Sequence, residues 1–294
     1  MKDILLVTGG AGFVGSNLIS ELLNFKKFKI ISIDNYSSGL IKNHIENKRI
    51  KYLKGNTSDI ETLLKKYIAR IHTIFHFGEF SRIYQSFKKI NECFSSNIEG
   101  SLKIFNFALK NKIKLIYSAT SASLGNKGED MNLSPYAFSK AKNLELLENL
   151  KKWFNFRYEI IYFYNVYGKN QICKGDMATV VGIFEDYFKK NKKLPVVKPG
   201  TQVRRFTHVN DTVKACIFAW KKNKCKHYSI VSKQSYSIKE LAKLFRKKIK
   251  YLPKREGERY TSTITKMNLN NKIIRLQAKI RLKDYVENFL RNYH

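Results

Sequence analysis

The sequence lacks an apolar stretch of the roughly 20 residues that a membrane-spanning helix needs. It also lacks repeats, low-complexity tracts and linkers rich in Pro, Gly and Ser. The N-terminus leads directly into a predicted strand, without an apolar signal region. The four cysteines show neither paired metal-ligand spacing nor a dense disulfide framework. We therefore expect reduced thiols, no metal site, no membrane span and a cytoplasmic location.

Acidic residues are scarce: the chain has 23 Asp and Glu and 56 Lys and Arg, which gives a formal net charge of +33. Such a charge is typical of proteins that bind nucleic acid or an anionic surface. The lysines are nevertheless spread along the chain, without arginine-rich arms or aromatic–basic motifs. We therefore expect no nucleic-acid partner and a general attraction for anionic substrates. A length of 294 residues with 43% hydrophobic residues suits one large or two modest domains with real cores.

Strand and helix patterns alternate through the first half of the chain, which is typical of an α/β fold with a doubly wound, parallel Rossmann-type sheet. The predicted strands are 3–8, 29–34, 50–54, 73–77, 113–118 and 157–163. The predicted helices lie near 13–25, 59–69, 85–110 and 134–154. A later β-like run, 227–231, is expected to return to the sheet.

The most informative segment is the glycine-rich turn after the first strand, Thr8 to Ser16, with Gly9, Gly10, Gly12 and Gly15. Closely spaced glycines let the backbone approach a diphosphate, and the following helix N-terminus presents free N–H groups and a positive dipole end. Together with an acidic residue at the end of the next strand, this pattern predicts a dinucleotide-binding unit.

That acidic residue is Asp34, which can accept hydrogen bonds from both ribose hydroxyls and repels a 2′-phosphate, and therefore favours NAD over NADP. Asn35 follows it, without an adjacent arginine. Asp59, in the next loop, either reaches the adenine or caps the following helix. We assign residues 1–165 to an NAD-binding domain and 166–294 to a discontinuous, smaller C-terminal α/β substrate lobe, with the return strand excepted.

A second segment with candidate catalytic residues runs from Ser134 to Lys140. Ser134 is a good N-cap, and Pro135 suits the first helical position. Tyr136 and Lys140 then share one helical face. An ammonium, a helix N-terminus and an oxidised nicotinamide would all stabilise the tyrosine phenolate. Taken alone, such a pair is equally a surface contact. The strand before Ser118 leads into several small hydroxyl residues, of which one can orient a reacting hydroxyl, unless they form an ordinary turn.

At this point the chain resembles the extended short-chain dehydrogenase/reductase family, in its NAD-dependent epimerase/dehydratase branch, and is most similar to UDP-glucose 4-epimerase-like proteins. The resemblance covers nearly the whole chain. It rests on the segments 8–15, 76–78, 97–100, 165–168 and 204–211, together with Asp34, Tyr136 and Lys140.

The resemblance implies Tyr136 as catalytic base, Lys140 as its pKa modulator and ribose ligand, and Thr120 as the catalytic hydroxyl residue, with Ser121 as second choice. It implies Asn165, Arg204 and Arg255 as substrate ligands, with Thr120. The expected cofactor-binding residues are Gly9, Gly12, Phe13, Val14, Gly15, Asp34, Asn35, Asp59, Ile60, Phe77, Gly78, Asn97, Ser118, Tyr136 and Lys140.

The same resemblance bears on the reaction. A 4,6-dehydratase of this family carries an Asp and a Glu directly after the catalytic threonine, where this chain has Ser121 and Ala122. The pattern therefore favours a UDP-hexose or UDP-N-acetylhexosamine 4-epimerase, which oxidises C4 transiently and returns the hydride. A 4-keto reductase or dehydratase, or a non-catalytic Rossmann-type binding protein, remain alternatives.

Two further features stay open. Glu79 and Arg82 stand where the family usually has small residues, and they either contact the substrate or pair with each other. The resemblance also implies a homodimer, formed through the helices 85–110 and 134–154.

Overall fold

The computed structural model describes residues 2–124, 132–254 and 273–293 of the chain. Eight parallel strands form its main sheet in the order β14-β11-β6-β5-β4-β1-β2-β3. In chain order they are β1 (Ile4–Thr8), β2 (Lys29–Asp34), β3 (Ile50–Lys54), β4 (Ile71–His76), β5 (Lys114–Thr120), β6 (Tyr158–Phe163), β11 (His227–Val231) and β14 (Ile273–Gln277). The predicted doubly wound α/β class is confirmed.

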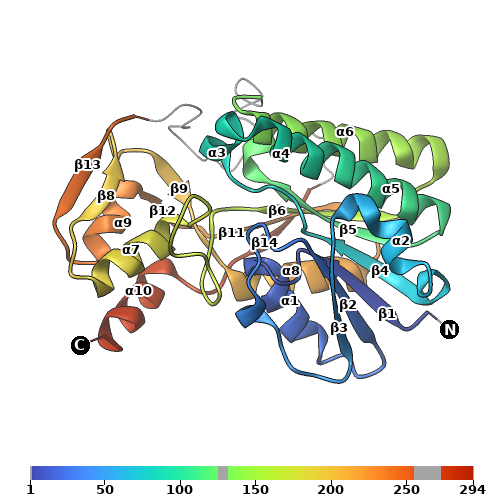
Figure 1. Ribbon diagram of the computed structural model, residues 1–294. Coiled ribbons are helices and arrows are strands. Elements are labelled where there is room, and N and C mark those ends of the chain that lie inside the picture. The colour runs from blue at the N-terminus through green and yellow to red at the C-terminus, as the bar shows by residue number, and fades with distance from the viewer. Residues whose placement is uncertain (1, 125–131, 255–272, 294) are drawn as a thin grey trace.

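Helices cover both faces of this sheet (Figure 1). On one face lie α1 (Phe13–Leu22) and α8 (Val209–Lys222). On the other face lie α2 (Ile60–Leu64), α5 (Ser101–Lys110) and α6 (Pro135–Phe154). The strands are therefore apolar on both sides.

The first strand shows how the two faces share the core. Ile4 and Leu6 belong to the cluster under α5 and α6. Leu5 and Val7 belong to the cluster under α1 and α8. All four side chains are at most 1% exposed, because successive strand residues point to opposite, equally covered faces.

The smaller lobe lies beyond the carboxyl ends of the sheet strands (Figure 1). It packs around its own core, which includes Phe184, Phe206 and Phe245. Its elements are α7 (Val180–Lys189), β8 (Leu194–Val197), β9 (Val203–Arg205), β12 (Ser235–Ser237), α9 (Ile238–Leu244), β13 (Ile249–Leu252) and α10 (Leu282–Arg291). A two-stranded pair, β7 (Val166–Tyr167) and β10 (Thr207–His208), completes the connection to the sheet.

Three segments differ from the sequence prediction. Residues 273–277 form the edge strand β14 of the main sheet rather than part of the smaller lobe, because Ile274 and Leu276 pack against the core under α1 and α8. The helix expected over 85–110 is broken into α3 (Ile83–Lys88), α4 (Ile90–Phe94), a π-helical turn η4 (Ser95–Gly100) and α5. Lys89, with φ −124° and ψ 48°, separates α3 from α4.

The helix expected over 59–69 is also short, since α2 ends at Leu64 and the rest includes a 3₁₀ turn, η3 (Ile68–Arg70). The remaining 3₁₀ turns are η1 (Ile41–Asn43), η2 (Thr57–Asp59) and η5 (Ser121–Leu124). All four cysteines are free thiols, as expected. Within the described ranges no helix is long and apolar enough to cross a membrane.

The sheet order places a ligand crevice. The chain runs outward from β1 to β2 and β3, and then returns to the other side of β1 with β4. The loops after β1 and β4 consequently leave the sheet in opposite directions, which opens a crevice at their carboxyl ends. The two loops nonetheless lie close together where they leave the sheet. The space between them is so small that a Cβ added to Gly9 would lie 2.8 Å from the amide nitrogen of Gly78.

Candidate active site

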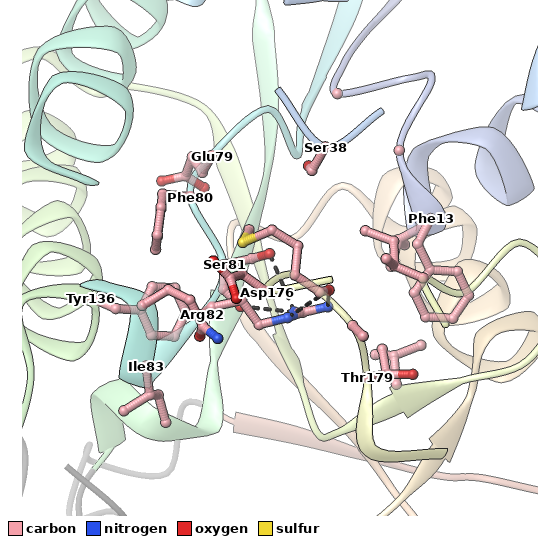
Figure 2. A pocket seen from close by; sticks show the side chains of 18 of the residues that line it. Phe13, Ser38, Glu79, Phe80, Ser81, Arg82, Ile83, Tyr136, Asp176 and Thr179 are labelled. Carbon is pink, nitrogen blue, oxygen red and sulfur yellow. Dashed lines mark hydrogen bonds between the residues drawn. The ribbon is translucent and has the colours of Figure 1, made fainter. Parts of the chain in front are cut away.

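A cavity of about 1350 Å³ occupies this crevice and extends to the smaller lobe. Figure 2 shows side chains from both lobes around it, among them Phe13, Arg82, Tyr136 and Thr179. Of the residues expected at the site, its lining includes Gly9, Gly12, Phe13, Val14, Gly15, Asp34, Asn35, Phe77, Gly78, Ser118, Thr120, Ser121, Tyr136, Lys140, Asn165 and Arg204.

The glycine-rich turn is tightly folded. Gly9 has a φ of +71°, in the left-handed region that favours glycine. A Cβ on Gly15 would lie only 2.1 Å from the carbonyl oxygen of Gly9. Helix α1 begins at Phe13 and has no side-chain cap on its first amides. These N–H groups and the positive helix end therefore border the cavity, as an anion site requires.

Asp34 ends β2 at the same rim. Its Oδ2 accepts a hydrogen bond from the Ala11 amide at 2.9 Å, and its Oδ1 accepts one from the Tyr36 amide at 2.8 Å. Burial raises the pKa of this carboxyl group, while the amides of Tyr36 and Ala11 counteract the effect. The carboxylate is thus bound to the glycine turn itself and lines the cavity.

Helix α6 begins as predicted. Ser134 is its N-cap and accepts a hydrogen bond from the Ala137 amide at 3.1 Å, and Pro135 occupies the first helical position. Tyr136 is buried in the first turn, and its own amide donates to Ser86 Oγ at 3.2 Å. Its ring points into the cavity opposite the glycine turn (Figure 2).

The Tyr136 phenol is strongly perturbed. Burial raises its pKa to about 12, a hydrogen bond with Thr120 lowers it, and the charges of Glu79 and Arg82 respectively raise and lower it. Thr120 Oγ1 also accepts from the Ala122 amide at 3.1 Å, which orients its hydroxyl at the end of β5. Thr120 and Ser121 both line the cavity, so Thr120 as the catalytic hydroxyl residue stays a prediction.

Lys140 is buried below this pair and forms an ion pair with Glu79. Its Nζ also donates to the Ser118 carbonyl at 2.5 Å and to Tyr117 Oη at 3.3 Å. Burial lowers the pKa of Lys140, and Glu79 opposes that effect. The ammonium group thus has protein acceptors for all three of its protons.

The Glu79 carboxylate accepts further hydrogen bonds at Oε1, from Tyr117 at 2.9 Å, Ser101 at 3.0 Å and Asn143 at 3.3 Å. Ser101 uses its proton for Glu79, so its oxygen accepts from Nε2 of His76 at 2.9 Å. This network assigns the His76 proton to Nε2 and leaves Nδ1 to accept from Thr8, 2.7 Å away. Burial lowers the pKa of His76 to about 4, consistent with a neutral ring.

Thr8 Oγ1 in turn accepts hydrogen bonds from the amides of Phe77 and Gly78, at 3.1 and 3.0 Å. A continuous buried network therefore runs from the glycine turn to Lys140. The sequence contained one indication of this network, because Glu79 stands where the family usually has small residues. Nothing in the sequence predicted that Lys140 is the partner of Glu79. Within the described part of the chain, Glu79 and Arg82 form no ion pair with each other.

Arg82 instead joins the two lobes. Its Nε lies 2.9 Å from the carbonyl oxygen of Met177, which Nη2 also contacts, and Nη1 donates to the Ser81 carbonyl at 2.9 Å. Figure 2 shows these contacts between Tyr136 and Asp176. Burial lowers the pKa of Arg82.

The turn after β6 and the smaller lobe contribute polar groups to the same cavity. Asn165, with a φ of +33°, donates from Nδ2 to the Arg205 carbonyl at 2.9 Å. Arg204 lines the cavity, whereas Nη1 of its neighbour Arg205 donates to the backbone of Ser232 and Lys233. The predicted substrate ligand Arg255 lies outside the described residues.

Three residues expected in the cofactor site do not line the cavity. Ile60 is a core residue, fully buried under α5. Asp59 is exposed at the N-cap position of α2, without a side-chain cap bond, and accepts from Ser58. Asn97 is buried in the π-helical turn, where its amide exchanges two hydrogen bonds with the backbone of Phe80. It thereby anchors the loop that carries Glu79 and Arg82.

The pattern of the NAD-dependent epimerase/dehydratase family matches residues 5–231. The chain belongs to this family. Among curated proteins it is 28% identical over 275 residues to a putative UDP-glucose 4-epimerase of Methanocaldococcus jannaschii, which covers 87% of this chain and 88% of that protein.

Solved structures with the same fold differ in reaction. A UDP-N-acetylglucosamine 4-epimerase from Methanobrevibacter ruminantium, in complex with UDP-N-acetylmuramic acid, has a TM-score of 0.84 and 25% identity over 100% of this chain and 98% of that one. A dTDP-glucose 4,6-dehydratase from Streptomyces venezuelae, with NAD bound, also has a TM-score of 0.84, at 19% identity over 99% and 96% of the two chains. The fold alone therefore does not separate epimerisation from dehydration.

NAD is the cofactor of this family, and the residues of this chain fit it. The turn between Gly9 and Gly15 lines the cavity and packs too closely on itself to carry a side chain at Gly15, where a Cβ would lie 2.1 Å from the Gly9 carbonyl oxygen. The free amides at the start of α1 suit its diphosphate, and Asp34 suits a ribose without a 2′-phosphate.

Proposed function

We propose that the chain is a nucleotide-sugar 4-epimerase that acts on a UDP-hexose or a UDP-N-acetylhexosamine. The observation that carries this proposal is that Thr120, Tyr136 and Lys140 line the same cavity as the glycine turn. A non-catalytic binding protein would have no need of a buried phenol, a hydroxyl and an ammonium group gathered beside a dinucleotide cradle. These three residues therefore favour an enzyme.

Bound NAD supplies the hydride acceptor and donor and, in its oxidised form, a positive charge beside the reacting sugar. Tyr136 holds or takes the proton at its Oη, and Thr120 hydrogen-bonds that hydroxyl and the sugar oxygen. In the cofactor-free chain the pKa of about 12 keeps Tyr136 protonated at neutral pH. We infer that its phenolate forms only when added positive charge lowers that pKa.

The residues after Thr120 support epimerisation over dehydration. Elimination of water across C5 and C6 needs an additional acid and base, which the dehydratases of this family supply as Asp and Glu. Ser121 and Ala122 occupy those positions here and offer no carboxylate. An epimerase needs only room for the keto sugar to turn over, and the cavity offers that room.

The substrate class is inferred from the relatives and from the polar groups of the smaller lobe. Relatives named for UDP-sugar epimerisation are found both by sequence and by structure. Asn165, in the turn after β6, and Arg204, on β9 of the smaller lobe, both line the cavity. Arg204 suits a diphosphate, because a guanidinium offers paired donors to phosphate oxygens.

The decisive experiment incubates the NAD-loaded protein with a panel of UDP-, GDP- and dTDP-sugars and follows anomeric signals by NMR. We expect a UDP-sugar to yield its C4 epimer without net NADH formation. A stable 4-keto-6-deoxy product would instead indicate a dehydratase, and stoichiometric use of reduced cofactor would indicate a reductase. Tyr136→Phe should lose turnover, whereas Tyr293→Phe, at a half-exposed site, should keep it.

We also propose a homodimer, formed through the helices between 83 and 154. Exposed apolar side chains on these helices support it: Phe87, Ile90, Leu102, Phe138, Trp153 and Phe154. Light scattering should show a dimer that the double substitution Leu102→Glu, Phe138→Glu converts to a monomer. Ile41→Glu, at a residue 72% exposed elsewhere, should leave the dimer intact. A monomeric wild-type protein would overturn this proposal.

A further inference from the structure

The ion pair of Glu79 and Lys140 is a feature of this chain that the resemblance does not supply. The resemblance assigns Lys140 two tasks, which are to stabilise the phenolate of Tyr136 and to bind a ribose. In this structure the Lys140 side chain is 4% exposed and that of Glu79 is 2% exposed. The Glu79 carboxylate is therefore buried beside the Lys140 ammonium group, which is expected to stabilise the phenolate of Tyr136.

The pair is held from several elements. Glu79 lies in the loop after β4, and three neutral donors fix its Oε1, from Tyr117 on β5, Ser101 on α5 and Asn143 on α6. Lys140 lies on α6 and donates to Ser118 on β5 as well as to Glu79. Both charged side chains are buried, and each has hydrogen-bond partners besides the other, which restrict the position of the ammonium group.

The balance of charge near Tyr136 follows from this arrangement. The charged and titratable groups around Tyr136 are Glu79 and Arg82 from the loop after β4, Cys93 from α4, Tyr117 from β5, and Lys140 one turn along its own helix. Lys140 faces Glu79, Cys93 and Tyr117, and its neighbour His76 is neutral. Glu79 supplies the negative charge in this group, and it raises the pKa of Tyr136.

We propose that Glu79 is a positioning residue that fixes Lys140 and offsets its charge beside Tyr136. The proposal rests on the function proposed above, with Tyr136 as the proton-transferring group. It assigns to Glu79 two effects: it holds the ammonium group in place, and it makes the phenolate harder to form in the free enzyme. Arg82 and the bound cofactor then supply the positive charge that the Lys140 ammonium, once paired, no longer offers in full.

The test is the pH profile of kcat/KM for the NAD-loaded enzyme, compared between the wild type and Glu79→Gln. Loss of the carboxylate should lower the pKa of Tyr136 and move the acidic limb of the profile to lower pH by about 1 pH unit. Glu79→Asp keeps the charge but shortens the side chain, so its limb should stay in place while kcat falls. Ser101→Ala keeps both charges and is the matched control, with an unmoved limb.

An acidic limb that stays in place in Glu79→Gln would overturn the proposal, since a merely structural role lowers the rate without moving the limb. A second measurement does not depend on the folding of a variant. In a crystal structure of the wild-type protein with NAD, the Glu79 carboxylate should remain within hydrogen-bonding distance of Lys140 Nζ. A Lys140 that has left Glu79 also overturns the proposal.

Failure of the proposed function is distinguishable from failure of this inference. If Tyr136→Phe keeps its turnover, the proposed mechanism fails and the pH profile no longer reports on Tyr136. If Tyr136→Phe is inactive and Glu79→Gln shows an unmoved limb, the inference about Glu79 fails and the mechanism stands.

Discussion

The guanidinium of Arg82 binds the backbone carbonyl of Met177, 95 residues along the chain, with Nε 2.9 Å from the oxygen. Arg82 comes from the loop before α3, and Met177 comes from the segment before α7 of the smaller lobe. One side chain therefore joins the two walls of the cavity. The same positive charge lowers the pKa of Tyr136.

From this relationship we predict the effect of Arg82→Gln. Loss of the positive charge should raise the pKa of Tyr136, so the acidic limb of the kcat/KM profile should move to higher pH, by about 1 pH unit. This direction is opposite to that expected for Glu79→Gln. Arg82→Lys keeps the charge and is the control, with a limb near that of the wild type. A shift to lower pH in Arg82→Gln would contradict the assignment.

Thr120 should contribute through its hydroxyl alone. Thr120→Val removes the hydrogen bond to Tyr136 while it keeps the shape of the side chain, and we expect kcat/KM to fall by about a hundredfold. Thr120→Ser retains the hydroxyl and should keep most of the activity. Steady-state kinetics with the epimerised sugar, together with unchanged NAD affinity, check this prediction. Equal loss in both variants would argue that the methyl group matters instead.

The glycine turn permits a graded test. Gly15→Ala would bring a Cβ to 2.1 Å from the Gly9 carbonyl oxygen, whereas Gly12→Ala would bring one to 3.1 Å from the same atom. The first change should weaken NAD binding by more than about tenfold, because the turn must shift, and the second should weaken it less. Calorimetric titration with NAD measures both. Equal affinities in the two variants would be inconsistent with a cradle of this shape.

Asp34 should decide between the two dinucleotides. Its carboxylate lines the cavity and is fixed by the amides of Ala11 and Tyr36. Asp34→Asn removes the charge at nearly the same size, and we expect the preference for NAD over NADP to fall by about tenfold or more. Asp34→Glu keeps the charge and should keep the preference. The ratio of the two dissociation constants is the measurement, and an unchanged ratio in Asp34→Asn would refute the role.

Local pattern predicted much of the fold. The strands around β1, β2 and β3 and the start of α6 at Ser134 and Pro135 follow from apolar runs and capping residues, and the structure has them within a residue or so. Such features depend on neighbours in the sequence. Within the helix expected over 85–110, the π-helical turn was missed, because its residue Asn97 bonds to Phe80, 17 positions away in the sequence.

The sequence by itself determined the glycine turn after β1, Asp34 at the end of β2, and the placing of Tyr136 and Lys140 one turn apart on α6, because each lies within a few residues of a strand or helix end. Only the tertiary structure decided what surrounds that pair. Glu79 reaches Lys140 from 61 positions away, and Arg82 turns instead to Met177. Partners of this kind depend on which strand ends the sheet brings together, and no local pattern records that choice.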